Sequence, residues 1–175
     1  MSDRPFVPVD CAVLTVSDTR TLETDTSGAV IVDRLTTLGH PVAAREIMPD
    51  DLDALAERIE GWCRDAAIKV VIITGGTGIT RRDVTPEACD RVLATDPEGK
   101  HIPGFGELFR WLSYRDIGTS TVQSRAGAWL AHGTLIFALP GSTGAVTLGM
   151  DEILNQQLDA RHRPCNFIQL LPRVG

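Results

Sequence analysis

The sequence lacks the features that would place the protein in a membrane or in a metal- or disulfide-stabilised class. No apolar run approaches the roughly 20 residues that a membrane-spanning helix needs, and no basic then apolar leader occupies residues 1–8. The histidines show no metal-ligand spacing, and the cysteines, Cys11, Cys63, Cys89 and Cys165, form no C-x-x-C pair. We therefore expect a cytoplasmic protein without a zinc site or disulfide framework, whose cysteines are small buried hydrophobic residues.

Positive charge is also scarce. Asp and Glu number 23 against 17 Lys and Arg, which gives a net charge of −6 and argues against nonspecific binding of nucleic acid. Nearly all of the positive charge is arginine, so the binding of an anionic small ligand by local arginines stays an open alternative. A chain of 175 residues is long enough for one domain with a normal core. We expect an extended arm over residues 1–10, a domain over 11–160 and a tail over 161–175 that packs on the core or on a neighbouring subunit.

A glycine-rich loop follows the most apolar stretch of the chain, within residues 69–86, KVVIITGGTGITRRDVTP. Residues 70–73 show no polar alternation, which is typical of a central parallel strand covered on both faces. Gly75, Gly76 and Gly78 leave backbone N–H groups free to approach a ligand, and Thr74 and Thr77 add hydroxyl donors. The loop has no lysine for a Walker A motif and no third glycine for a dinucleotide fingerprint. The pattern indicates an anion-binding loop of another kind, or a polar connection between a strand and a helix.

Three polar clusters follow three of the expected strands. We expect strands at 11–16, 41–48, 70–73 and 134–139, and helices at 28–38, 52–66, 86–94, 108–112, 120–130 and from about 143 to 158, with a loop at 95–102. The order of the first three strands and their helices predicts parallel strands joined by right-handed crossovers, with ligands at the carboxyl ends. Ser17-Asp18, Asp50-Asp51 and residues 75–83 fall on that edge. In this interpretation Asp50 and Asp83 follow adjacent strands.

Helix capping is the structural alternative for several of these polar residues. Ser27 and Thr85 are predicted N-caps, and Ser142 or Thr143 caps the long helix near the C-terminus. One of the two aspartates at 50 and 51 can cap the helix that follows them. Glu107, which follows a predicted Gly-Phe-Gly turn, has the alternative role of a charge near a helix N-terminus.

Five motifs together resemble one family. TGGTG, RRDVTPEA, PGFGELFR, GTSTVQSRA and LPGST, in this order and spacing, are similar to the MoaB/MogA family of molybdenum cofactor biosynthesis proteins and molybdopterin adenylyltransferases. The resemblance covers Cys11 to Leu171, and GTSTVQSRA with LDARHRPCNF resembles the B-type branch in particular. It implies a three-layer α/β/α domain around a mostly parallel mixed sheet, assembled as a trimer or hexamer. It also implies transfer of AMP from Mg-ATP to the terminal phosphate of molybdopterin, with release of pyrophosphate.

The resemblance also implies roles for individual residues. Asp50 and Asp83 are the catalytic and Mg²⁺-binding candidates, and this chain has both acidic motifs, which some B-type members lack. The candidates for substrate and nucleotide binding are Ser17, Asp18, Gly75, Gly76, Thr77, Gly78, Glu107, Ser124, Arg125, Pro140, Gly141 and Ser142. The partners implied are small-molecule substrates, further copies of the chain and other cofactor-biosynthesis proteins.

Two other functions stay open at this stage. A molybdopterin-binding or carrier protein would keep the glycine loop and hold the intermediate without adenylylating it. A generic nucleotide-binding oxidoreductase is disfavoured by the broken dinucleotide fingerprint.

Overall fold

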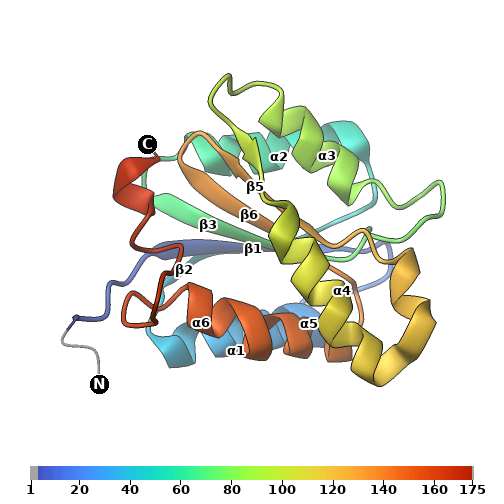
Figure 1. Ribbon diagram of the computed structural model, residues 1–175. Coiled ribbons are helices and arrows are strands. Elements are labelled where there is room, and N and C mark those ends of the chain that lie inside the picture. The colour runs from blue at the N-terminus through green and yellow to red at the C-terminus, as the bar shows by residue number, and fades with distance from the viewer. Residues whose placement is uncertain (1–3, 175) are drawn as a thin grey trace.

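The structure is a computed structural model that describes residues 4–174, and it shows one mixed six-stranded sheet between two layers of helices (Figure 1). The strands are β1 (Asp10–Val16), β2 (Val42–Met48), β3 (Ile68–Thr74), β4 (Lys100–His101), β5 (Gly127–Ala131) and β6 (Thr134–Leu139). The helices are α1 (Thr26–Leu38), α2 (Leu52–Arg64), α3 (Thr85–Leu93), α4 (Pro103–Ile117), α5 (Thr143–Gly149) and α6 (Asn155–Gln157). Shorter helical segments are η1 (Gly118–Gln123), η2 (Met150–Leu154) and η3 (Leu171–Arg173). The predicted fold class is confirmed. Residues 1–3 of the predicted arm and Gly175 lie outside the described residues.

The strand order is β2-β1-β3-β6-β5-β4. The first four strands in this order are parallel, β5 runs antiparallel to β6, and the short strand β4 at the edge runs antiparallel to β5. The loops that follow β1, β2, β3 and β6 therefore all leave the same edge of the sheet. This edge is where α/β proteins of this kind place their ligands.

The apolar residues of the central strands alternate between two cores. In β1, Cys11 and Val13 face the core beneath α1, α4 and α5, whereas Ala12 and Leu14 face the core beneath α2 and α3. All four are completely buried. Both faces of a parallel strand are covered by crossover helices, which explains why these strands show no polar alternation in the sequence.

The helix predicted over residues 120–130 is wrong. The segment contains the 3₁₀ helix η1 and then β5, which pairs with β6 through a tight turn at His132 and Gly133, both with positive φ (51° and 75°). Positive φ at both turn residues matches the right-handed twist of a two-residue hairpin. The predicted loop at 95–102 likewise contains the short strand β4, which pairs with β5.

The predicted Gly-Phe-Gly turn before residue 108 is also wrong. Pro103 is the first residue of α4, a position that suits proline because its missing N–H would have no partner there. Phe105 is buried in the core beneath the helix. Glu107 therefore lies one turn inside α4, on its exposed side.

Two of the predicted N-caps are replaced by other residues. Asp25, not Ser27, caps α1, and the Ser27 hydroxyl instead donates to Gly141 O (2.8 Å). Val84 is the cap residue of α3, while the buried Thr85 hydroxyl donates to Gly75 O (2.8 Å). In both cases the hydroxyl that was expected to cap a helix donates a hydrogen bond to a neighbouring loop instead. Ser142 caps α5 as predicted, and Gly39 ends α1 with φ of 107°.

The C-terminal tail packs on the chain's own core. Ile168 is buried in the core beneath α1 and α4, and Phe167 packs against the same cluster. Cys165 is exposed, so the expectation that every cysteine is buried is wrong for this one. Within residues 4–174, no helix is both long enough and apolar enough to cross a membrane.

Candidate functional site at the carboxyl edge of the sheet

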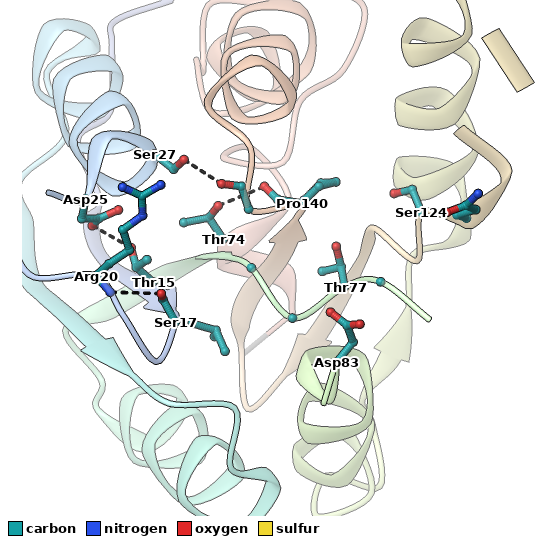
Figure 2. A pocket seen from close by; sticks show the side chains of 16 residues that line it. Thr15, Ser17, Arg20, Asp25, Ser27, Thr74, Thr77, Asp83, Ser124 and Pro140 are labelled. Atoms are coloured by element: carbon teal, nitrogen blue, oxygen red, sulfur yellow. Dashed lines mark hydrogen bonds between the residues drawn. The ribbon is translucent and has the colours of Figure 1, made fainter. Parts of the chain in front are cut away.

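A cavity of about 440 Å³ lies at the carboxyl edge of the parallel strands. Its polar side chains form two groups on either side of Thr74 and Pro140 (Figure 2). The lining residues are Thr15, Val16, Ser17, Arg20, Asp25, Ser27, Thr74, Gly75, Gly76, Thr77, Gly78, Asp83, Gln123, Ser124, Pro140 and Gly141. The cavity therefore brings together the loops after β1, β3 and β6 with the segment that precedes β5.

The glycine loop forms the centre of the cavity floor, and its backbone needs glycine. Gly75 and Gly76 have φ of 103° and 65°. A Cβ on Gly75 would lie 2.3 Å from Val16 O, and one on Gly76 would lie 2.3 Å from the Thr85 hydroxyl. The N–H groups of Gly76 and Thr77 donate to no acceptor within residues 4–174. Two successive backbone N–H groups that lack an acceptor form a concavity that binds anions.

Hydrogen bonds on the far side of the loop hold these amides in place. Thr85 donates its hydroxyl to Gly75 O (2.8 Å) and its backbone N–H to Gly76 O (3.0 Å). The Thr74 hydroxyl donates to Pro140 O (3.0 Å), which ties the glycine loop to the turn after β6. The carbonyl groups of Gly75 and Gly76 thus point into the protein, and the N–H groups of Gly76 and Thr77 point toward the cavity.

Arg125 is a positioning residue for the same loop. Its backbone N–H donates to Thr77 O (3.0 Å), its Nε to Gly78 O (2.7 Å) and its Nη2 to Asp83 O (2.8 Å). The guanidinium also forms an ion pair with Glu87. Because these contacts occupy the guanidinium, Arg125 supports the loop from behind, whereas its neighbour Ser124 lines the cavity.

The opposite wall contains a buried aspartate that the sequence analysis did not select. Asp25 accepts hydrogen bonds from the Thr15 hydroxyl (2.8 Å), from Gly28 N (2.8 Å) and from Arg45 Nη2 (3.1 Å). Its side chain is only 1% exposed. The available signal was its place just before Ser27 and Gly28 at the start of a helix, where an aspartate is a preferred cap. Arg20, also missed, lies in the loop between β1 and Asp25 and lines the cavity.

Asp50 and Asp83 do not follow adjacent strands, because β1 lies between β2 and β3. They nevertheless flank the glycine loop. Asp50 Oδ1 is 2.9 Å from the position that a Cβ on Gly76 would take, and Asp83 Oδ2 is 2.8 Å from the corresponding position on Gly78. Asp83 lines the cavity itself.

The two carboxylates have opposite electrostatic surroundings. Partial burial raises the pKa of Asp50, and the carboxylates of Asp18 and Asp83 add to this effect, which Arg82 opposes. For Asp83, burial acts in the same direction but is outweighed by hydrogen bonds from Thr80, so that its pKa is lowered. Asp83 is thus held as a charged group, while the charge on Asp50 is disfavoured without a further cation nearby.

The structure assigns the helix cap to one of the two neighbouring aspartates. Asp51 accepts hydrogen bonds from Asp53 N and Ala54 N, both at 3.0 Å, and is the N-cap of α2. Asp50 forms no hydrogen bond to another residue within the described part of the chain. Its carboxylate is therefore available to a ligand of the loop.

Besides Asp50 and Arg125, which are not among the lining residues either, three candidates lie away from this cavity. Asp18 is exposed, lines a neighbouring open cavity with Arg45 and forms an ion pair with Arg82. Ser142 caps α5 through its hydroxyl, although the adjacent Gly141 lines the cavity. Glu107 lies exposed on α4 and is not among the lining residues.

The donor set around the loop fits a metal ion that arrives with phosphates. No group of three His, Cys, Asp or Glu side chains among residues 4–174 is arranged to hold a metal by itself. Mg²⁺ typically uses one or two carboxylates together with substrate phosphates and waters. Asp50 and Asp83, on either side of unoccupied amides, would supply such carboxylates.

Fold and site together define an α/β protein whose glycine loop presents amides at the carboxyl edge of parallel strands. The model of the family described as "Probable molybdopterin binding domain" matches residues 12–160. Molybdenum cofactor biosynthesis protein B of Escherichia coli (strain K12) is 45% identical over 162 residues, which are 93% of this chain and 92% of that protein.

Solved structures agree with this family. A crystal structure of molybdenum cofactor biosynthesis protein B is similar with a TM-score of 0.85 and 36% identity, over 98% of both chains. The tungsten cofactor synthesizing protein MoaB from Pyrococcus furiosus gives a TM-score of 0.76 and 31% identity, over 95% of this chain and 97% of that one. The chain belongs to the molybdopterin-binding family of molybdenum cofactor biosynthesis proteins, as the five motifs indicate.

Proposed function

We propose that this protein acts in molybdenum cofactor biosynthesis by adenylylating molybdopterin. An oxygen of the terminal phosphate of molybdopterin attacks the α-phosphorus of ATP and forms a new P–O–P bond. The bond between the α-phosphorus and the β-phosphate oxygen breaks, and pyrophosphate leaves. The products are adenylyl-molybdopterin and pyrophosphate.

The observation that carries this proposal is the placement of Asp50. Its carboxylate lies beside the free amides of the glycine loop but makes no hydrogen bond to another described residue, since Asp51 caps the helix. A carrier that only bound a phosphate would gain nothing from this carboxylate, because it repels an anion. Nucleotidyl transfer gains from it when Mg²⁺ is bound, since the metal neutralises the phosphates.

The remaining contacts serve binding and orientation. The amides of Gly76 and Thr77 are placed to hold phosphate oxygens, because fixed donors stabilise charge without reorganisation. Ser124, on the wall opposite Ser27, would bind a polar part of one of the substrates. No side-chain nucleophile is needed, since the substrate's own phosphate attacks. We further propose that the protein is cytoplasmic and forms a trimer or hexamer.

The test is pyrophosphate release by the purified full-length chain with molybdopterin, ATP and Mg²⁺. Release that requires all three components, together with an adenylylated pterin detected by mass spectrometry, is the expected result. Omission of molybdopterin is the control for ATP hydrolysis. Saturable molybdopterin binding without pyrophosphate would support the carrier function instead, and failure to bind molybdopterin would exclude both.

A further inference from the structure

An ion pair bridges two of the loops at the carboxyl edge of the sheet. Arg82 Nη2, in the loop after β3, pairs with Asp18 Oδ2, in the loop after β1. These two strands are neighbours, so the pair lies beyond their carboxyl ends. Both side chains are accessible, with 65% of Arg82 and 39% of Asp18 exposed. Within residues 4–174, neither side chain has a second hydrogen-bond or ion-pair partner.

The backbone of Arg82 is held in a turn, whereas its side chain is held only by Asp18. Asp83 N donates to Thr80 O (3.2 Å), and Thr80 N donates to Asp83 Oδ2 (2.9 Å). Arg82 N donates to Thr80 Oγ1 (3.3 Å) inside this turn. The guanidinium therefore extends from a fixed base next to Asp83, which lines the cavity. Because an exposed ion pair contributes little stability, the side chain can leave Asp18 easily.

The Arg82 guanidinium lies close to the carboxylates that flank the glycine loop. Burial and the carboxylates of Asp18 and Asp83 raise the pKa of Asp50, and Arg82 opposes them. Asp50 Oδ1 is itself 2.9 Å from the position that a Cβ on Gly76 would take. The positive charge that acts on Asp50 is therefore near the N–H groups at the centre of the cavity floor.

Two other arginines near the cavity are held by backbone carbonyl groups. Arg125 Nη2 donates to Asp83 O (2.8 Å). Arg20 Nη1, on the opposite wall, donates to Thr24 O (3.0 Å). The Arg82 side chain donates to no carbonyl group within the part of the chain that the structure describes. An anion at the glycine loop can therefore recruit Arg82 by displacing one exposed ion pair.

We propose that Arg82 exchanges Asp18 for the phosphates of the nucleotide that leave as pyrophosphate. This inference rests on the proposed function and names a residue that touches the leaving group. When the bond between the α-phosphorus and the β-phosphate oxygen breaks, its electron pair stays on that oxygen, and the guanidinium stabilises the added negative charge. A guanidinium suits this task because it binds two phosphate oxygens at once and keeps its charge. Asp18 is a positioning residue that keeps Arg82 beside the glycine loop until the nucleotide binds.

Calorimetric titration of the full-length chain with pyrophosphate in the presence of Mg²⁺ tests the exchange without molybdopterin. Arg82→Ala should weaken binding about 10- to 100-fold, as expected for lost hydrogen bonds between charged groups. Arg82→Lys should recover part of the loss, because lysine keeps the charge but not the paired donors. Arg81→Ala is the matched control and should bind as the wild-type chain does. Arg81 is exposed on the same turn, lines a different open cavity and forms no ion pair within residues 4–174.

A double-mutant cycle separates the exchange from simple repulsion of the anion by Asp18. Asp18→Asn should strengthen pyrophosphate binding about two- to fivefold, because an exposed ion pair no longer competes for the guanidinium. In the Arg82→Ala background the same substitution should have no effect. An equal gain in both backgrounds would show that Asp18 acts only through its own charge and would overturn the exchange. Melting temperatures should stay unchanged in every variant, because the pair is exposed.

Pyrophosphate release with molybdopterin and Mg-ATP gives the second readout. Arg82→Ala should lower kcat about 10²-fold, since the contact strengthens as the leaving group gains charge. An unchanged kcat would overturn the inference, and so would pyrophosphate binding that is absent in the wild-type chain or unaffected by Arg82→Ala. A wild-type chain that binds pyrophosphate through Arg82 but releases none from ATP would overturn the proposed adenylylation alone.

Discussion

Asp50 and Asp51 are neighbours in the chain with separate tasks in the structure, and three substitutions separate these tasks. Asp51→Ala removes both hydrogen bonds that its carboxylate accepts at the start of α2. Loss of such a cap typically costs about 1 kcal/mol. For a chain of this size, that lowers the melting temperature by about 2–4 °C. Asp51→Asn keeps an acceptor oxygen and should leave the melting temperature unchanged.

Asp50→Asn should have the opposite effects, with an unchanged melting temperature and a lower turnover. Burial and the carboxylates of Asp18 and Asp83 raise the pKa of Asp50, so its charge does not stabilise the fold, and its removal should not lower the melting temperature. If the carboxylate acts with Mg²⁺ in the reaction, its loss should lower turnover about 10²- to 10³-fold, as for one preorganised electrostatic group. Molybdopterin binding should largely persist, because the glycine loop is unchanged.

The assay is pyrophosphate release with molybdopterin and Mg-ATP beside a thermal melt, for all three variants and the wild-type chain. We expect Asp51→Ala to be less stable with nearly normal turnover per folded molecule, and Asp50→Asn to be equally stable but slow. Full turnover in Asp50→Asn would remove the basis for the proposed chemistry. A collapse of turnover in Asp51→Asn, with an unchanged melt, would show that the roles of the two aspartates are assigned the wrong way round.

Two further predictions concern the glycine loop and a buried histidine. Gly76→Ala should abolish phosphate binding, measured by calorimetric titration with ATP, because its Cβ would lie 2.3 Å from the Thr85 hydroxyl at φ of 65°. Gly61→Ala is the control, since it meets nothing within 4 Å in α2 and should keep the affinity. Burial lowers the pKa of His40, whose Nδ1 accepts from Val9 N (3.1 Å), so the unfolded chain binds its proton first. Stability should therefore fall as pH drops below about 6.5, and a melting temperature unaffected between pH 7.5 and 5.5 would contradict this reasoning.

The segments predicted correctly from the sequence are those whose local pattern favours one kind of secondary structure over the others. Residues 70–73 of β3 are all β-branched and are followed by a glycine-rich loop, which favours a strand covered on both faces. Gly39 can end α1 because glycine adopts a positive φ at little cost. The segment over 120–130 failed because a short apolar run fits either a helix or a buried strand. Pairing with β6, through the turn at His132 and Gly133, decided in favour of β5.

The sequence predicted which loops form the site but not how these loops are arranged in space. Gly75, Gly76, Gly78 and the acidic motifs were evident in the chain, but their spatial relation was not, since β1 lies between the strands that precede Asp50 and Asp83. Asp25 was missed because it follows a polar loop and acts through contacts with Thr15 and Arg45, which come from two different strands.

By itself, the sequence determined the class of fold, the parallel strands and the family, because these depend on local periodicity and on motifs of fixed order. Only the tertiary structure decided which of two adjacent aspartates caps α2, that the Arg125 guanidinium holds the loop from behind, and that Glu107 lies on the outer face of α4 instead of in the cavity. These outcomes depend on which distant groups a side chain meets. Strand order and helix placement fix those distances, and no local pattern in the chain records them.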